Sequence, residues 1–79
     1  MKIEILGSGC PKCKELENRV KNVLSKTGIK SSISKITDVN KIIDYGVLST
    51  PALVINGKVV SSGRIPTTEE IEKWVKNNL

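Results

Sequence analysis

Residues 2–14 read KIEILGSGCPKCK, and this stretch decides the fold. Its opening residues alternate isoleucine with charged side chains and then reach glycines, which predicts a strand over 2–6 that ends in a loop. Pro11 follows at a position typical of the first turn of a helix, where the N–H that proline lacks is not needed. Cys10 and Cys13 therefore stand where a strand leads into a helix, and the chain has no other cysteine.

The rest of the chain alternates helical and strand-like patterns. The predicted elements are a helix from Pro11 to about Lys26, a polar edge strand over 29–36, a short helix between Asp38 and Gly46, strands over 52–55 and 58–60, and a last helix that begins at Thr67. Asn56-Gly57 favours the positive φ angles of a type I′ turn, so the last two strands should be antiparallel neighbours. The order βαβαββα predicts one α/β domain over residues 1–79, a four-stranded mixed sheet flanked by helices.

Apolar residues at helical spacing predict the buried face of each helix. They are Cys13, Leu16, Val20, Val23 and Leu24 in the first helix, Val39, Ile42 and Ile43 in the second, and Ile71, Trp74, Val75 and Leu79 in the third. Asp38 is the predicted N-cap of the second helix, and Thr67-x-x-Glu70 has the spacing of a capping box. Because Cys13 shares its stripe with core residues, we expect its thiol to be the more buried of the pair.

Length and composition exclude several classes of function. The chain has 79 residues, and domains of this size often need a disulfide or a similar cross-link for stability. A disulfide between Cys10 and Cys13, however, closes too short a loop to stabilise the fold much. The net charge of +5 comes mainly from scattered lysines, with few aromatics or arginines, so we expect no nucleic-acid partner. We also expect no membrane association and a cytoplasmic location, because no apolar run could cross a bilayer and residues 1–7 do not read as a secretory signal.

The positions of the two thiols predict different roles for them. Cys10 lies beside the unpaired N–H groups that begin a helix, which favour a thiolate and lower the thiol pKa. Lys12 and Lys14 act in the same direction, although exposed lysines add little through water. We expect Cys10 to be the nucleophile that attacks a disulfide and Cys13 to be the thiol that resolves the mixed disulfide. Pro11 stiffens the link between them.

The C-x-x-C pattern alone leaves redox chemistry and metal binding equally open. Zinc usually takes four ligands, and this chain has no histidine and no further cysteine. No metal ligands are therefore assigned, although Cu(I) needs only two thiolates and stays an alternative. Gly7 and Gly9 are too closely spaced for a nucleotide-binding fingerprint, so we interpret them as a flexible loop.

Several segments together resemble the thioredoxin superfamily over nearly the whole chain. They are CPKC (10–13) at the start of a helix, YGVLSTP (45–51), ALVI (52–55) and the ING turn. More narrowly, the chain resembles small thioredoxin/glutaredoxin-like proteins with a redox-active disulfide. The resemblance implies a thioredoxin-like fold, a redox-active disulfide between Cys10 and Cys13, and a cis peptide bond before Pro51.

The resemblance also implies roles for residues outside the cysteine pair. Thr50 and Pro51 would form the platform for an extended substrate segment, with Pro11 and Lys12 as further substrate contacts. Glu4 lies six residues before the first cysteine, where thioredoxins have a buried acidic residue that carries protons for the resolving thiol. The alternative for Glu4 is a solvated strand carboxylate that pairs with a lysine.

Two departures from the family pattern narrow the expected substrate. Gly9 stands where thioredoxins have a tryptophan, and the segment SSGR (61–64) replaces the Gly-Gly pair and acidic residues that hold glutathione in glutaredoxins. We therefore expect protein disulfides rather than glutathione as substrates.

The sequence thus predicts a monomeric protein disulfide oxidoreductase that needs no bound cofactor. An electron-donating disulfide reductase, which the sequence does not identify, would return the pair to the dithiol. One alternative is a metal-binding or metallochaperone module that uses the same cysteines. Small copper chaperones share the C-x-x-C, but they follow a βαββαβ order and lack the Thr-Pro element. The other alternative is a non-enzymatic redox-switch domain.

Overall fold

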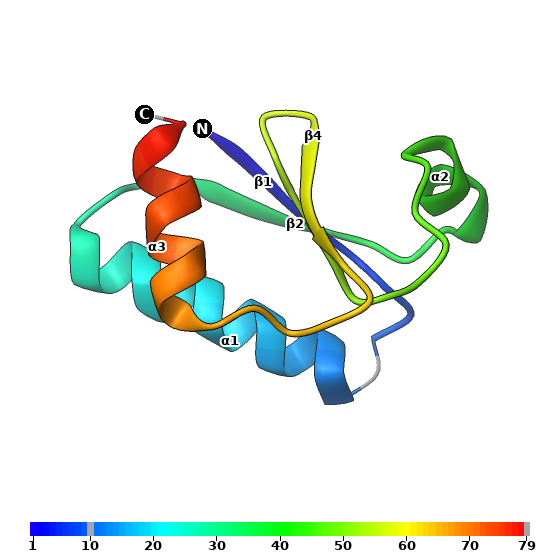
Figure 1. The fold of residues 1–79 in the computed structure, drawn as a ribbon, viewed down its shortest axis with the longest axis horizontal. Helices are drawn as coiled ribbons and strands as arrows, with labels where there is room; N and C mark the ends of the chain where they lie inside the picture. The colour runs from blue at the N-terminus through cyan, green and yellow to red at the C-terminus, as the bar shows by residue number, and fades with distance from the viewer. Residues whose placement is uncertain (10, 79) are drawn as a thin grey trace.

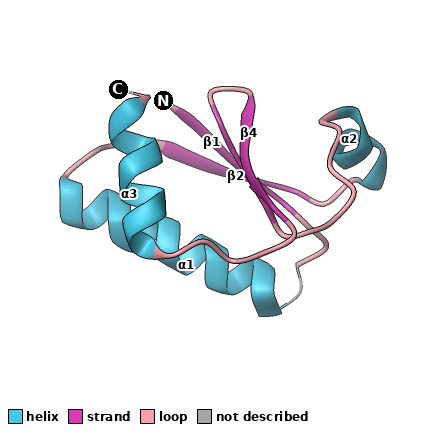
Figure 2. Ribbon diagram, in the orientation of Figure 1, coloured by secondary structure: helices cyan, strands magenta, loops and turns pink. Residues whose placement is uncertain are grey.

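A computed structural model describes residues 1–9 and 11–78 (Figure 1). The elements are β1 (Lys2–Leu6), α1 (Pro11–Thr27), β2 (Ser32–Ile36), α2 (Val39–Asp44), β3 (Ala52–Ile55), β4 (Lys58–Ser62) and α3 (Thr68–Asn77). Their order, βαβαββα, confirms the order predicted from the sequence. The fold is the expected α/β arrangement, in which the described strands form one four-stranded mixed sheet (Figure 2).

β1 and β3 form the centre of the sheet, whose strand order is β2-β1-β3-β4. β1 runs parallel to β2, because α1 carries the chain back across one face between them. β1 pairs antiparallel with β3, and β3 pairs antiparallel with β4. The turn between β3 and β4 holds Asn56 and Gly57 at φ angles of 52° and 80°. These positive angles are those that the Asn-Gly dipeptide predicts.

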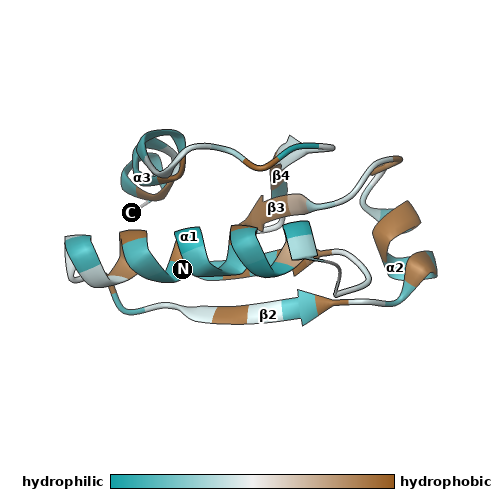
Figure 3. Ribbon diagram, turned by 90° about the horizontal axis from the view of Figure 1, so that it is seen from below, coloured by the Kyte–Doolittle hydropathy of each residue, from teal (hydrophilic) through white to brown (hydrophobic). Residues whose placement is uncertain are grey.

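The helices divide the core into two clusters on opposite faces of the sheet. α1 and α3 lie together over one face (Figure 1), and Figure 3 shows that each of these helices carries both apolar and polar residues. The buried residues of both helices pack with those of the strands in one cluster. This larger cluster comprises Ile3, Ile5, Leu16, Val20, Val23, Leu24, Leu53, Ile55, Ile71 and Val75. The smaller cluster, on the α2 side, comprises Leu6, Ile42, Val47, Ala52 and Val54. β1 contributes to both clusters, because successive side chains of a strand point to opposite faces.

Two strand boundaries differ from the prediction, and backbone hydrogen bonds explain both. β2 begins only at Ser32, because the chain first completes the end of α1. Gly28 takes a φ of 71°, and the N–H of Ile29 donates to the C=O of Leu24 at 3.2 Å, a common way to end a helix. β4 extends to Ser62, because its last residues continue the pairing with β3.

The predicted N-caps of α2 and α3 are both confirmed. The Asp38 side chain accepts a hydrogen bond from the N–H of Asn40 at 2.9 Å. Thr67 and Glu70 form the reciprocal hydrogen bonds of a capping box at the start of α3. Caps depend on residues three or fewer positions apart, so a local pattern is sufficient to predict them.

The predicted apolar face of α2 needs correction. Ile42 is 8% exposed, but Val39 and Ile43 are 64% and 56% exposed. In α3 the predicted face is confirmed, because Ile71 and Val75 are fully buried and Trp74 packs, partly buried, against the same larger cluster. Leu79, predicted on the same face, lies outside the described residues. Among the helices described, none combines the length and the apolar character that crossing a membrane requires.

Candidate functional site

Cys13 lies in the first turn of α1, on the side that packs against the sheet. It is 6% exposed and continues the buried stripe that includes Leu16 and Val20. The helical spacing therefore predicted the burial of this thiol correctly. Cys10, the predicted nucleophile, lies outside the described residues, and so does the predicted disulfide between the two cysteines.

Gly7 lies directly against the sulfur of Cys13. A Cβ added at Gly7 would clash with Cys13 Sγ and would come within 3.8 Å of the Cβ of Thr50. The Gly7 N–H donates to the C=O of Ile36 at 2.9 Å, which ties the loop to the end of β2. Interpreting Gly7 as loop flexibility missed this close approach. The available signal was its position, where β1 must turn back toward the start of α1.

Thr50 and Pro51 form the other side of the site. The peptide bond between them is cis, the isomer that the resemblance implied. Pro51 is buried and Thr50 is exposed. The C=O of Pro51 accepts a hydrogen bond from the N–H of Gly63 at 3.0 Å, which joins this loop to the end of β4. The structure thus brings together Cys13 and Thr50, which are far apart in sequence.

A groove of about 440 Å³ extends from Thr50 toward α2, and we call it the α2 groove. It is lined by Ser8, Thr37, Val39, Ile42, Ile43, Val47, Leu48 and Thr50. Leu48 is 97% exposed, and with Val39 and Ile43 it forms an open apolar patch next to Thr50. Contiguous exposed apolar surface of this kind commonly marks a site that binds a partner. Sequence reasoning missed the groove, because it assigned the apolar residues of α2 to the core.

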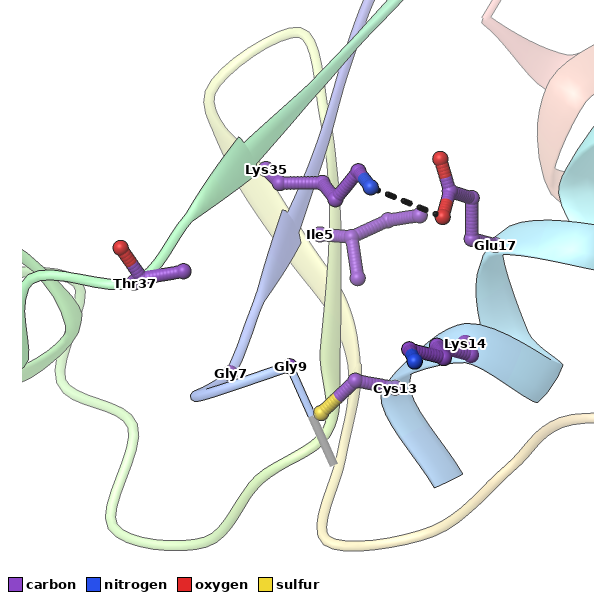
Figure 4. Close-up of a pocket in the computed structure, with 8 residues that line it drawn as sticks. All are labelled: Ile5, Gly7, Gly9, Cys13, Lys14, Glu17, Lys35 and Thr37. Carbon is purple, nitrogen blue, oxygen red and sulfur yellow. Dashed lines mark ion pairs between the residues drawn. The ribbon is translucent and has the colours of Figure 1, made fainter. Parts of the chain in front are cut away.

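A smaller cavity, of about 50 Å³, lies behind Cys13 between β1, β2 and α1 (Figure 4). We call it the thiol cavity. It is lined by Ile5, Gly7, Gly9, Cys13, Lys14, Glu17, Lys35 and Thr37. Figure 4 shows the Cys13 sulfur pointing toward the loop of Gly7 and Gly9. Beyond Ile5, Lys35 and Glu17 point toward one another.

The polar side of the thiol cavity is an ion pair between β2 and α1. Lys35 Nζ lies 3.3 Å from Glu17 Oε1, and Lys21 Nζ lies 3.3 Å from Glu17 Oε2. Burial acts to raise the pKa of Glu17, but the hydrogen bonds and charges of Lys21 and Lys35 outweigh it and hold that pKa below its usual range. Sequence reasoning missed this pair. The only local signal was the place of Glu17 one helical turn after Cys13.

Glu4 is buried, as the resemblance implied, but it lies on the other face of the sheet. It is 5% exposed, and its Oε1 accepts a hydrogen bond from the Tyr45 hydroxyl at 2.7 Å. This hydrogen bond raises the pKa of Tyr45. The next residue, Ile5, is the one that lines the thiol cavity. Because adjacent strand residues point to opposite faces, the structure does not bring Glu4 to Cys13.

The remaining predicted site residues lie at the start of α1. Pro11 and Lys12 are exposed in its first turn, close in sequence to Cys13. Within residues 1–9 and 11–78, no group of three or more His, Cys, Asp or Glu side chains is arranged to hold a metal ion. Arg64 pairs with Glu70 through nitrogen–oxygen distances of 2.7 and 3.0 Å.

Comparison with known proteins extends these observations. Residues 1–76 match the family described as thioredoxin domain. A thioredoxin from Methanocaldococcus jannaschii is 40% identical over 77 residues, which cover 98% of this chain and 88% of that protein. A thioredoxin from Methanothermobacter thermautotrophicus is 34% identical, covering 92% of this chain and 95% of the relative. The crystal structure of the germline-specific thioredoxin Deadhead from Drosophila melanogaster has the same fold. It gives a TM-score of 0.63 at 22% identity, covering 99% of this chain and 80% of that one.

Proposed function

The chain belongs to the thioredoxin family, and from this premise we propose that it reduces disulfides in partner proteins through Cys10 and Cys13. The observation that carries the proposal is the meeting of two distant segments at Gly7. There the Cys13 sulfur and the Cβ of Thr50 approach the same point in space. A disulfide exchange site needs a thiol next to a surface that holds the substrate backbone, and this juxtaposition supports such a site.

In the proposed reaction, the thiolate of Cys10 attacks one sulfur of a substrate disulfide. A bond forms between Cys10 Sγ and that sulfur, and the second substrate sulfur leaves with the electron pair and takes up a proton. Cys13 then loses its proton and attacks Cys10 Sγ, which releases the first substrate sulfur as a thiolate. The substrate is reduced, and the cysteine pair is oxidised to a disulfide. An electron-donating disulfide reductase returns the pair to the dithiol.

The burial of Cys13 supports its assignment as the resolving thiol. A thiol that is 6% exposed is poorly accessible to a bulky protein disulfide. It can still attack a neighbouring sulfur within the same chain, because that step is intramolecular. We assign the first attack to Cys10, because the N–H groups that begin α1 favour a thiolate there.

The α2 groove supports a protein as the substrate. Its apolar residues border Thr50, so a substrate segment held at Thr50 could continue into the groove over Leu48 and Val39. The segment that follows β4, which contacts Pro51 through Gly63, does not resemble a glutathione site. Arg64 in this segment is paired with Glu70, so its guanidinium is already occupied by a carboxylate of the same chain.

The test is disulfide exchange with insulin as the substrate. Reduced wild-type protein should reduce insulin, Cys10→Ser should be inactive, and Cys13→Ser should accumulate a mixed disulfide that gel electrophoresis without reductant detects. The matched control is Ser25→Ala, which changes an exposed serine of α1 that lines neither the α2 groove nor the thiol cavity and should leave the rate unchanged. If the wild type shows no exchange but binds Cu(I) through both sulfurs, the metallochaperone alternative replaces the proposal. One round of exchange without turnover by a reductase would instead favour the redox switch.

A further inference from the structure

The thiol cavity places a fixed arrangement of charges behind Cys13. Charged residues reach it from two elements: Lys14 and Glu17 from α1, and Lys35 from β2. Its other lining residues, Ile5, Gly7, Gly9 and Thr37, are uncharged. Ile5 lies between the sulfur and the Lys35–Glu17 pair (Figure 4). The sulfur and the ion pair therefore line the same cavity on the two sides of an apolar side chain.

Glu17 is held more tightly than a typical surface carboxylate. Its side chain is only 12% exposed, whereas those of Lys35 and Lys21 are 62% and 59% exposed. Both of its oxygens face an ammonium group at 3.3 Å. Attraction from these ammonium groups keeps the carboxylate ionised, which agrees with its lowered pKa. Charges next to low-dielectric protein interact more strongly than charges in open water.

We propose that the Lys35–Glu17 ion pair sets the ionisation of the Cys13 thiol across the thiol cavity. Lys35 favours the Cys13 thiolate, and Glu17 offsets the charge of Lys35. This proposal rests on the proposed function, since it concerns the thiol that resolves the mixed disulfide. In that step the Cys13 proton leaves to solvent, Cys13 Sγ bonds to Cys10 Sγ, and the substrate sulfur departs with the electron pair.

Removing the two partners one at a time should shift the thiol pKa in opposite directions. Glu17→Gln leaves the charge of Lys35 uncompensated, which stabilises the thiolate and lowers the Cys13 pKa. Lys35→Met removes the ammonium group over the cavity and leaves the carboxylate compensated only by Lys21, which destabilises the thiolate and raises that pKa. Because Ile5 separates the pair from the sulfur, we expect shifts of about 0.5 pKa unit each, less than a charge in direct contact produces. The double variant should return close to the wild-type value.

The chain contains a matched control for the carboxylate. Glu72 on α3 also bridges two lysines, with Lys76 Nζ at 3.0 Å and Lys26 Nζ at 3.5 Å. Its side chain is 23% exposed, and it is not among the residues that line the thiol cavity. Glu72→Gln changes the net charge by the same amount as Glu17→Gln. It should leave the Cys13 pKa unchanged, because it acts only through the overall charge of the molecule.

The test is a pH titration of Cys13 in the Cys10→Ser background, followed by ultraviolet absorbance of the thiolate and by the rate of iodoacetamide alkylation. Circular dichroism at each pH identifies any variant that unfolds. If one variant unfolds, the proposal is still decided by either of two comparisons of the Cys13 pKa. The first compares Glu17→Gln with Glu72→Gln, and the second compares Lys35→Met with the double variant. Opposite shifts that cancel in the double variant support the proposal. It is overturned if both single variants shift the pKa in the same direction, if neither shifts it, or if Glu72→Gln shifts it as far as Glu17→Gln.

This titration does not depend on the proposed function. It measures a thiol in a chain that cannot complete disulfide exchange, so the ion-pair effect can be present even if insulin is not reduced. In the two-cysteine protein, Glu17→Gln should displace the pH profile of mixed-disulfide resolution to lower pH, and Lys35→Met should displace it to higher pH. If the titration shifts but insulin reduction is absent, the proposed function fails and the ion-pair effect stands.

Discussion

The apolar side chains that lie on the two sides of the sheet are buried to different degrees. On the face under α1 and α3, Leu16 is fully buried, whereas Leu48 beside α2 is 97% exposed. The two residues are of the same type, so the difference lies in what covers them. The first face supplies apolar burial for folding, and the second leaves apolar surface next to Thr50. A chain this short has little core. Val39, Ile43 and Leu48 are nevertheless exposed among the described residues, which favours a role for this surface in binding.

The sharpest test of this comparison is to shorten the same side chain on each face. Leu16→Ala should lower the free energy of unfolding by about 2–5 kcal/mol, because it removes buried methyl groups and leaves a cavity. Leu48→Ala should change it by about 0.5 kcal/mol or less, because the side chain makes few contacts to lose. Urea denaturation at constant pH measures both. Equal losses in the two variants would break the distinction between the faces.

The next largest effect is expected where the well-packed face reaches the site. Gly7→Ala places a methyl group against Cys13 Sγ, so the thiol must rotate or the loop must move. We expect a loss of about 1–3 kcal/mol in the free energy of unfolding, as for other overpacked sites. Resolution of the mixed disulfide should also slow, which quenching with acid and mass spectrometry can follow. Ser25→Ala is the control, and normal resolution in Gly7→Ala would refute the close approach.

A smaller effect should appear on the open face, in binding rather than in folding. Leu48→Ala should lower the rate constant for insulin reduction about fivefold, which corresponds to burying about half of a leucine side chain against a substrate. Reduction of a small aromatic disulfide reagent should not change, because that reagent does not extend into the α2 groove. An equal loss with both disulfides would show that Leu48 acts on the thiols and not on the substrate.

The smallest expected effect concerns the start of α3. Hydrogen bonds from Arg64, with the backbone of Thr67, lower the pKa of Glu70 to about 2 from the ordinary 4.5. Because the pKa of Glu70 is lower in the folded state than in the unfolded state, its ionised carboxylate stabilises the fold. This contribution is fully present above the unfolded-state pKa and is lost as the pH falls toward about 2. Glu70→Gln should therefore lower the melting temperature at neutral pH, and its difference from wild type should shrink in acid. A difference that stays constant across that range would contradict the assignment, and Glu69→Gln is the control.

The element order and the helix caps could be predicted because they depend on residues close together in the chain. Asn56-Gly57 determines its own turn, and Thr67 and Glu70 cap α3 without help from other elements. The bounds of β1 and β3 were also predicted correctly, but the start of β2 and the end of β4 depend on other segments, so the sequence alone did not locate them. The start of β2 depends on how α1 ends at Gly28. The exposure of Val39 depends on what packs over α2, which no local pattern records.

The site was predictable to a lesser degree. The burial of Cys13 followed from helical periodicity, but the approach of Thr50 to it could be expected only from the resemblance to a family. Glu17 and Lys35 meet through the crossover from β1 to β2, and no spacing in the sequence indicates that meeting. The role implied for Glu4 came from its position in the chain. That position does not decide which face of β1 lies toward Cys13.

The strand order also affects how the molecule behaves next to copies of itself. β2 and β4 form the two edges of the sheet, and an edge strand presents unpaired backbone groups to which another chain can add. Both edges are five residues long and carry lysine and serine in place of a continuous apolar run. Short polar edges with lysine discourage such pairing. The same Lys35 that reaches Glu17 therefore also helps to keep the sheet from growing into a fibril.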